Sequence, residues 1–80
     1  MTEQEVVQLI EAQRGQLSID DEMEFEAAEK MFVEHKDNPE EPGPVEHRVA
    51  WIATYACSWG TIEIYVDDQS KAILRILRSA

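Results

Sequence analysis

The stretch Val49–Val66, VAWIATYACSWGTIEIYV, contains both tryptophans, both tyrosines and the single cysteine of this 80-residue chain. β-Branched and aromatic residues, which fit a pleated and half-buried surface, form two runs within it. Ser58, Trp59 and Gly60 separate the runs, and a short break that contains glycine is typical of a β-hairpin. The stretch therefore predicts a hairpin at the centre of an antiparallel sheet.

Alternating positions define the faces of this hairpin. One face of its first strand carries Val49, Trp51, Ala53 and Tyr55. The other face is hardly more polar, and a strand that is apolar on both sides is usually central. The second strand has one clean apolar face, formed by Ile62, Ile64 and Val66. Asp67–Ser70 has the composition of a turn, and residues 72–77 predict a third strand or a short helix.

The N-terminal segment has the pattern of an amphipathic helix over residues 3–14. Thr2 and Glu5 have the spacing of a capping box. An apolar stripe at helical spacing follows, formed by Val6, Val7, Leu9, Ile10 and Ala12. Gly15 occupies the position at which a left-handed residue would end the helix.

Residues 23–34 fit two structures. Their propensities favour a helix, and Phe25, Ala28 and Phe32 would then line one face. Met23, Phe25 and Ala27 also alternate with glutamates, as in a strand with one apolar face and one face in solvent. Met31 and Val33 would continue the apolar face. Both interpretations stay open at this point.

A loop over residues 38–44 holds all three prolines and cannot continue a helix or a ladder. Val-Glu-His occurs on both sides of it, at 33–35 and 45–47. If both flanks are strands, a wide hairpin would bring these two triplets near each other.

Three short motifs resemble those of PepSY-like α+β domains. They are WIATY at 51–55, IEIYVD at 62–67 and ILRI at 73–76. The chain departs from the family pattern at 68–71, where the family has a glycine and this sequence has none. The resemblance implies that residues 23–34 are a strand in a four-stranded sheet. It also implies an inhibitory or regulatory role, and it provides no catalytic residues.

The expected fold class is thus α+β, with a helix on an antiparallel sheet of three to four strands and residues 23–34 as a strand or a second helix. Eighty residues make a single domain. The lone Cys57 excludes an internal disulfide and is typical of a reducing compartment. No signal peptide or membrane-spanning segment is recognisable, so we expect a cytoplasmic location and no membrane partner.

The charge is large and uneven. The net charge is −10, which argues against nucleic acid as a partner. Residues 1–46 have 14 acidic and three basic residues, whereas residues 47–80 have three and four. This acidic half is either a solvated face that maintains solubility or a surface for a basic protein, as in an immunity protein that neutralises a toxin.

No pattern for catalysis, metal or cofactor binding stands out. His35, His47 and Cys57 lack the spacing of metal ligands. His47 and Cys57 would lie about 33 Å apart on one strand at 3.3 Å per residue, too far for a nucleophile and its base. Asp67 and Asp68 would face opposite ways. We therefore expect neither an enzyme nor a cofactor.

Surplus apolar surface indicates a binding role, because one helix covers only one face of a sheet. An exposed apolar patch usually marks an interface. We expect self-association or a protein partner, with an interface drawn from Trp51, Tyr55, Trp59, Tyr65 and Ile76.

Overall fold

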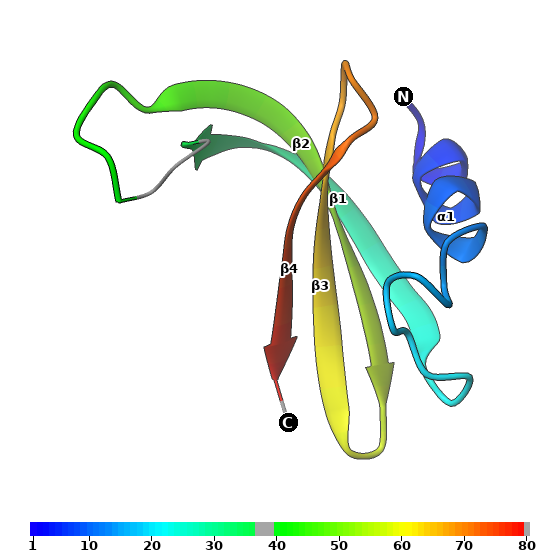
Figure 1. Ribbon diagram of the computed structural model, residues 1–80. Coiled ribbons are helices and arrows are strands. Elements are labelled where there is room, and N and C mark those ends of the chain that lie inside the picture. Colours follow the sequence, from blue (N-terminus) through cyan, green and yellow to red (C-terminus); the bar gives the residue numbers. More distant parts are fainter. Residues whose placement is uncertain (37–39, 80) are drawn as a thin grey trace.

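One helix and four strands make up the computed structural model, which describes residues 1–36 and 40–79 (Figure 1). They are α1 (Glu3–Glu11), β1 (Glu24–His35), β2 (Glu46–Cys57), β3 (Gly60–Asp67) and β4 (Ile73–Ser79). The strands follow one another in the order β1-β2-β3-β4, and all neighbours are antiparallel. The predicted α+β class is confirmed, and the β2–β3 hairpin lies at the centre of the sheet.

The first turn of α1 is held by the predicted capping box. The Thr2 hydroxyl accepts a hydrogen bond from the Glu5 amide at 3.2 Å, and the Glu5 carboxylate accepts one from the Thr2 amide at 3.1 Å. These bonds satisfy two amides that a helix start leaves without partners. One turn apart, Val6 and Ile10 are fully buried against the sheet.

The end of α1 differs from the expectation. The helix stops at Glu11 rather than near residue 14, and helical turns continue to a left-handed residue at Ser18, with φ of 57°. The Ile19 amide donates to the Arg14 carbonyl at 3.0 Å and the Ser18 amide to the Gly15 carbonyl at 3.3 Å. This is a Schellman motif. Gly15 does not have a positive φ, so its predicted role as the terminating residue was wrong.

The ambiguous segment 23–34 forms a strand, because β1 pairs with β2 from Glu24 to His35. The Phe25 ring packs edge-on against the Tyr55 ring, with 5.7 Å between centroids. A register shift between Phe25 and Ala27 then changes the side to which later residues point. Met31 and Val33 therefore share a face with Ala27 but not with Phe25, which corrects the predicted alternation.

The core lies between α1 and one face of the sheet. Its buried members are Val6, Ile10, Ile19, Met23, Ala53, Tyr55, Ile62, Ile64 and Val66. Figure 1 shows α1 beside β1 and β2, with β4 farthest from the helix. The predicted apolar face of β3 is the one that packs here, together with the Ala53 and Tyr55 face of β2. We call the opposite side of the sheet the open face.

Arg14 fastens the segment between α1 and β1 onto this core. One guanidinium nitrogen donates to the carbonyls of Asp20 at 2.6 Å and Met23 at 2.8 Å, and the other contacts the Glu11 carboxylate at 3.1 Å. The guanidinium also lies 5.7 Å from the Tyr55 ring centroid. One side chain thus links the end of the helix, the connection and the buried aromatic pair.

The β2–β3 connection is short, whereas the β1–β2 connection spans residues 36–45. Ser58 and Trp59 form a two-residue turn, with Cys57 opposite Gly60. Part of the predicted 38–44 loop, Asn38 and Pro39, lies outside the described residues, and residues 40–45 contain no strand.

The β3–β4 connection contains a strained residue, since Lys71 has φ of 62°. The Lys71 amide donates to the Asp67 carbonyl at 3.0 Å, and the Asp67 amide donates to the Ala72 carbonyl at 2.8 Å. These bonds hold the turn in a conformation that glycine adopts without steric cost. The sequence lacks a glycine in this turn, so Lys71 bears the cost.

We predict that Lys71→Gly stabilises the protein. Relief of the left-handed strain, about 1–2 kcal/mol for an L residue, exceeds the added chain entropy of glycine in the unfolded state, about 0.5–1 kcal/mol. Urea unfolding measures the difference, and Lys71→Ala is the control because it keeps the Cβ. Equal or lower stability of Lys71→Gly relative to Lys71→Ala would contradict the assignment.

Candidate functional site: the open face of the sheet

The five predicted interface residues do not form one surface. Tyr55 is fully buried in the core, and Trp51 and Ile76 are half-buried against it on the helix side. Trp59 is 52% exposed in the β2–β3 turn, where its indole donates to Glu22 at 3.3 Å. Of the five, Tyr65 alone lies on the open face. The prediction of one shared interface was therefore wrong for Tyr55, because the helix covers the face that this side chain shares with Trp51.

The open face nevertheless has an apolar character. The strand registers place Ile52 beside Tyr65 and Ala50 beside Met31 there. Its apolar members are Ala27, Met31, Val33, Ala50, Ile52, Ala56, Tyr65 and Leu77. Among the described residues, no helix covers this side. Ala50 is buried, but Ala27, Met31 and Leu77 are exposed and the other four are partly exposed. Apolar side chains in contact with solvent are typical of a binding surface.

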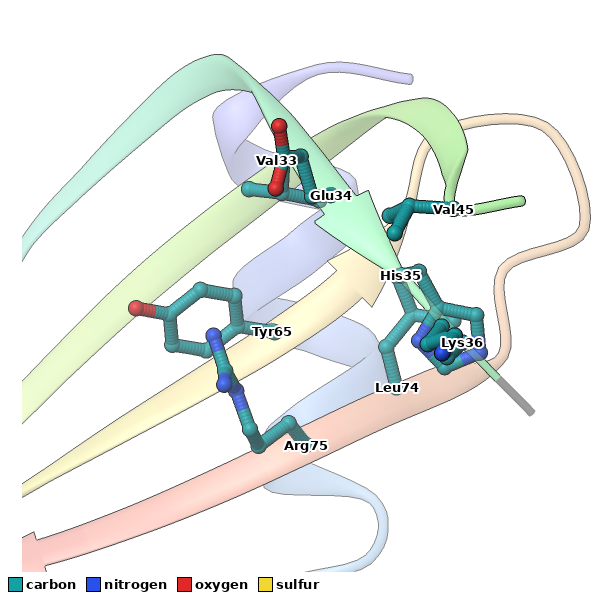
Figure 2. A pocket seen from close by; sticks show the side chains of 8 residues that line it. All are labelled: Val33, Glu34, His35, Lys36, Val45, Tyr65, Leu74 and Arg75. Atoms are coloured by element: carbon teal, nitrogen blue, oxygen red, sulfur yellow. The ribbon is translucent and has the colours of Figure 1, made fainter. Parts of the chain in front are cut away.

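A pocket of about 480 Å³ lies at one end of the open face (Figure 2). Its wall includes Val33 near the end of β1, Val45 just before β2, and Tyr65 and Leu74 from β3 and β4. Residues of the first and the last strand thus meet here, because the β1–β2 hairpin curls toward β4 in the twisted sheet. The Val-Glu-His repeat pointed to this end of the hairpin, but not to its approach to β4.

An aromatic ring and a guanidinium form the floor of this pocket. The Arg75 guanidinium lies 4.7 Å from the Tyr65 ring centroid, and Figure 2 shows the two side chains stacked. Tyr65 and Arg75 are paired across β3 and β4. The register shift after Tyr65 inserts Leu74 as an extra residue, and this places Leu74 in the pocket wall. No sequence signal marked Leu74, since a bulge has no fixed motif.

Beside the pocket, two aspartates that the sequence indicated as turn formers hold structural contacts. The buried Asp67 carboxylate accepts from the Ser70 amide at 2.7 Å and lies 3.7 Å from the Arg48 guanidinium. The Ser70 amide is the main reason that the pKa of Asp67 is lowered, against the opposing effect of burial, and Arg48 adds to it. Asp67 is thus a buried carboxylate that holds the turn after β3 and pairs with Arg48.

Asp68 points to the helix side, as the alternation predicted. Its carboxylate accepts from the Trp51 indole at 2.9 Å, and this bond is the main reason that the pKa of Asp68 is lowered. The N-terminal ammonium lies 3.5 Å away and Lys30 lies 3.8 Å away. The two aspartates therefore use different partners on opposite sides of the sheet.

Tyr55 is the most perturbed titratable group of the core. Burial, aided by the nearby Glu11 carboxylate, raises the pKa of Tyr55 to about 12. Its hydroxyl donates to Glu11 at 3.5 Å. Tyr55 is therefore a buried, hydrogen-bonded phenol of the core.

The other candidate chemical groups are kept apart. Glu34 is opposite His47 and His35 is opposite Glu46, so the two histidines point to opposite faces. His47 and Cys57 lie near the two ends of β2. Within residues 1–36 and 40–79, no group of three or more histidine, cysteine, aspartate or glutamate side chains is arranged to hold a metal ion.

The acidic half of the sequence corresponds to exposed surface. Every acidic residue in 1–36 and 40–46 is exposed, from Glu3 in α1 to Glu46 at the start of β2. In contrast, Glu63 and Asp68 are half-buried and Asp67 is buried. The negative field around the molecule therefore comes from the first half of the chain. In the part of the chain that the structure describes, no helix is both long and apolar enough to cross a bilayer.

No family model matches the chain, and neither the curated proteins nor the solved structures compared with it give a match. The likeness to PepSY-like domains stays a prediction.

We predict that Asp67→Asn destabilises the protein at neutral pH by about 1.5–3 kcal/mol, as expected for loss of a hydrogen bond to a charged group. Because folding lowers the pKa of Asp67, its contribution is present above the ordinary aspartate pKa and is lost as the pH falls through the folded value. The difference between wild type and Asp67→Asn should therefore shrink below about pH 3.9. Urea unfolding at pH 7 and pH 3 measures it. A constant difference, or an equal loss in the exposed control Asp21→Asn, would refute the assignment.

Proposed function

We propose that the protein is a non-catalytic binding module that holds a protein partner on the open face. The observation that carries this proposal is the pocket at one end of a sheet face that α1 does not cover, whose lining combines apolar side chains with Glu34, His35, Lys36 and Arg75. Covering such a face with a partner removes apolar surface from water, the main favourable term in most protein association.

The pocket and the charge together suggest the chemistry of the partner. Val33, Val45 and Leu74 would accept a large apolar side chain. Exposed carboxylates surround the molecule, with a net charge of −10, and would attract a segment with lysine or arginine beside that apolar anchor. The resemblance to PepSY-like domains adds an inhibitory or regulatory role for such binding.

Selection of peptides from a random 12-residue library would test this proposal. We predict that selected peptides combine an apolar anchor with basic flanks, and that Val45→Asp weakens their binding at least tenfold by placing a charge in the pocket wall. Val45 is 39% exposed and precedes β2, so the fold should tolerate the change.

Leu77→Asp is the matched control for the anchor, because Leu77 is 40% exposed and belongs to the open face but does not line the pocket. It should alter binding much less. If the two variants bind equally, or if no peptide depends on Val45, the pocket is not the anchor site.

The exposed acidic half supports a second candidate, an immunity-type protein that neutralises a basic protein. Here affinity would come mainly from charge rather than from the pocket, so it would fall steeply as salt screens the carboxylates. A selected basic ligand whose binding is insensitive to Val45→Asp but lost on raising salt from about 0.05 M to about 0.5 M would favour this candidate over the first.

A further inference from the structure

The outer edge of β1 combines an unpaired ladder with the most exposed aromatic side chain among the described residues. β1 is the first strand of the sheet, so β2 occupies one of its edges only. Phe32 is 80% exposed and Met31 is 42% exposed. An unpaired edge with apolar side chains is a template for another strand.

β1 is the longer and more regular of the two edge strands that the structure describes, although its regular part carries the charged side chains Glu29, Lys30 and Glu34. β4, the opposite edge, is seven residues long, has a register shift and is fastened by Arg78 to the carbonyls of Leu17 and Ser18. In β1 the register shift lies between Phe25 and Ala27, so residues 27–35 continue without a bulge. Long, regular edges of this kind favour strand addition.

We propose that two copies of this protein form a dimer by antiparallel pairing of their β1 edges, with Phe32 of each copy on the two-fold axis. This pairing uses the edge of β1, where Met31 and Val33 are also members of the open face. It goes beyond the proposed function and does not rest on it. It would join the two sheets into one sheet of eight strands.

Symmetry limits the registers that can be formed. A two-fold axis perpendicular to the sheet keeps the same face upward in both copies, so facing residues come from the same face. With Phe32 on the axis, the two phenyl rings meet and Met31 faces Val33 of the other copy. Lys30 then faces Glu34 of the other copy, twice in each dimer. Opposite charges in facing positions stabilise an antiparallel pair.

The neighbouring registers lack this complementarity. An axis through Lys30 sets two lysines face to face, and an axis through Val33 sets Lys30 against Lys36. An axis through Met31 sets Lys30 against Phe32. Like charges in facing positions are destabilising, so charge selects the register centred on Phe32.

The side chains are available for these contacts. Lys30 is 50% exposed, and its ammonium is 3.8 Å from the Asp68 carboxylate, a distance at which a surface ion pair contributes little. Glu34 is exposed. Seven residues of each copy, 29–35, would pair, which makes a small interface and a weak dimer.

A charge exchange tests the register. Sedimentation equilibrium from about 5 µM to about 500 µM, the range over which small interfaces dissociate, should show wild type approaching twice the 9.2 kDa chain mass. We expect Glu34→Lys to weaken the dimer about tenfold, because it faces Lys30 of the other copy with a like charge. The double variant Lys30→Glu/Glu34→Lys should restore dissociation to within about threefold of wild type.

General electrostatic repulsion between acidic copies predicts the opposite effect of Glu34→Lys on the affinity of the dimer. Glu34→Lys lowers the net negative charge, so without a specific register it would strengthen association. Glu24→Lys makes the same charge change on the same strand, outside the paired residues, and should not weaken the dimer. Thermal unfolding of each dilute variant verifies that it is folded. A wild type that is monomeric throughout, a Glu34→Lys variant that behaves as Glu24→Lys, or a double variant without recovery would overturn the proposal.

Discussion

The packing of α1 against one face of the sheet is the constraint on which the rest of the structure depends. Val6 and Ile10 reach the centre of that face, where Ala53, Ile64 and Val66 are fully buried. A single helix cannot also cover the other face or shield both edges of four strands. The chain therefore has a compact core on one side of the sheet and apolar side chains in contact with solvent on the other. Successive residues of each strand point alternately to these two sides.

Specific polar contacts stabilise this one-sided arrangement. Arg14 fixes the connection that returns the chain from α1 to β1, and Asp67 closes the turn from β3 to β4. Both side chains bond to backbone groups and so define the paths of these connections, and each also contacts an oppositely charged side chain, Glu11 or Arg48. The carboxylates of the first half are exposed around this arrangement.

Local signals in the sequence were sufficient for several elements. The Thr2–Glu5 capping box and the alternation of β3 correctly predicted the helix start and the buried face, because each depends on neighbouring residues only. The change of face after Phe25, the left-handed Ser18 and the position of Leu74 could not be predicted. They depend on register and on the curl of the whole sheet, which a single segment does not encode. Tyr55 was misplaced for the same reason, since its burial depends on where α1 lies.

Hydrogen–deuterium exchange at several protein concentrations tests most directly the claim that the uncovered sheet boundary is used for association. Pairing of the β1 edges predicts that exchange of residues 29–35 slows as concentration rises. β3 should not change, because strands flank both of its edges. Exchange in β1 that is independent of concentration would contradict edge pairing.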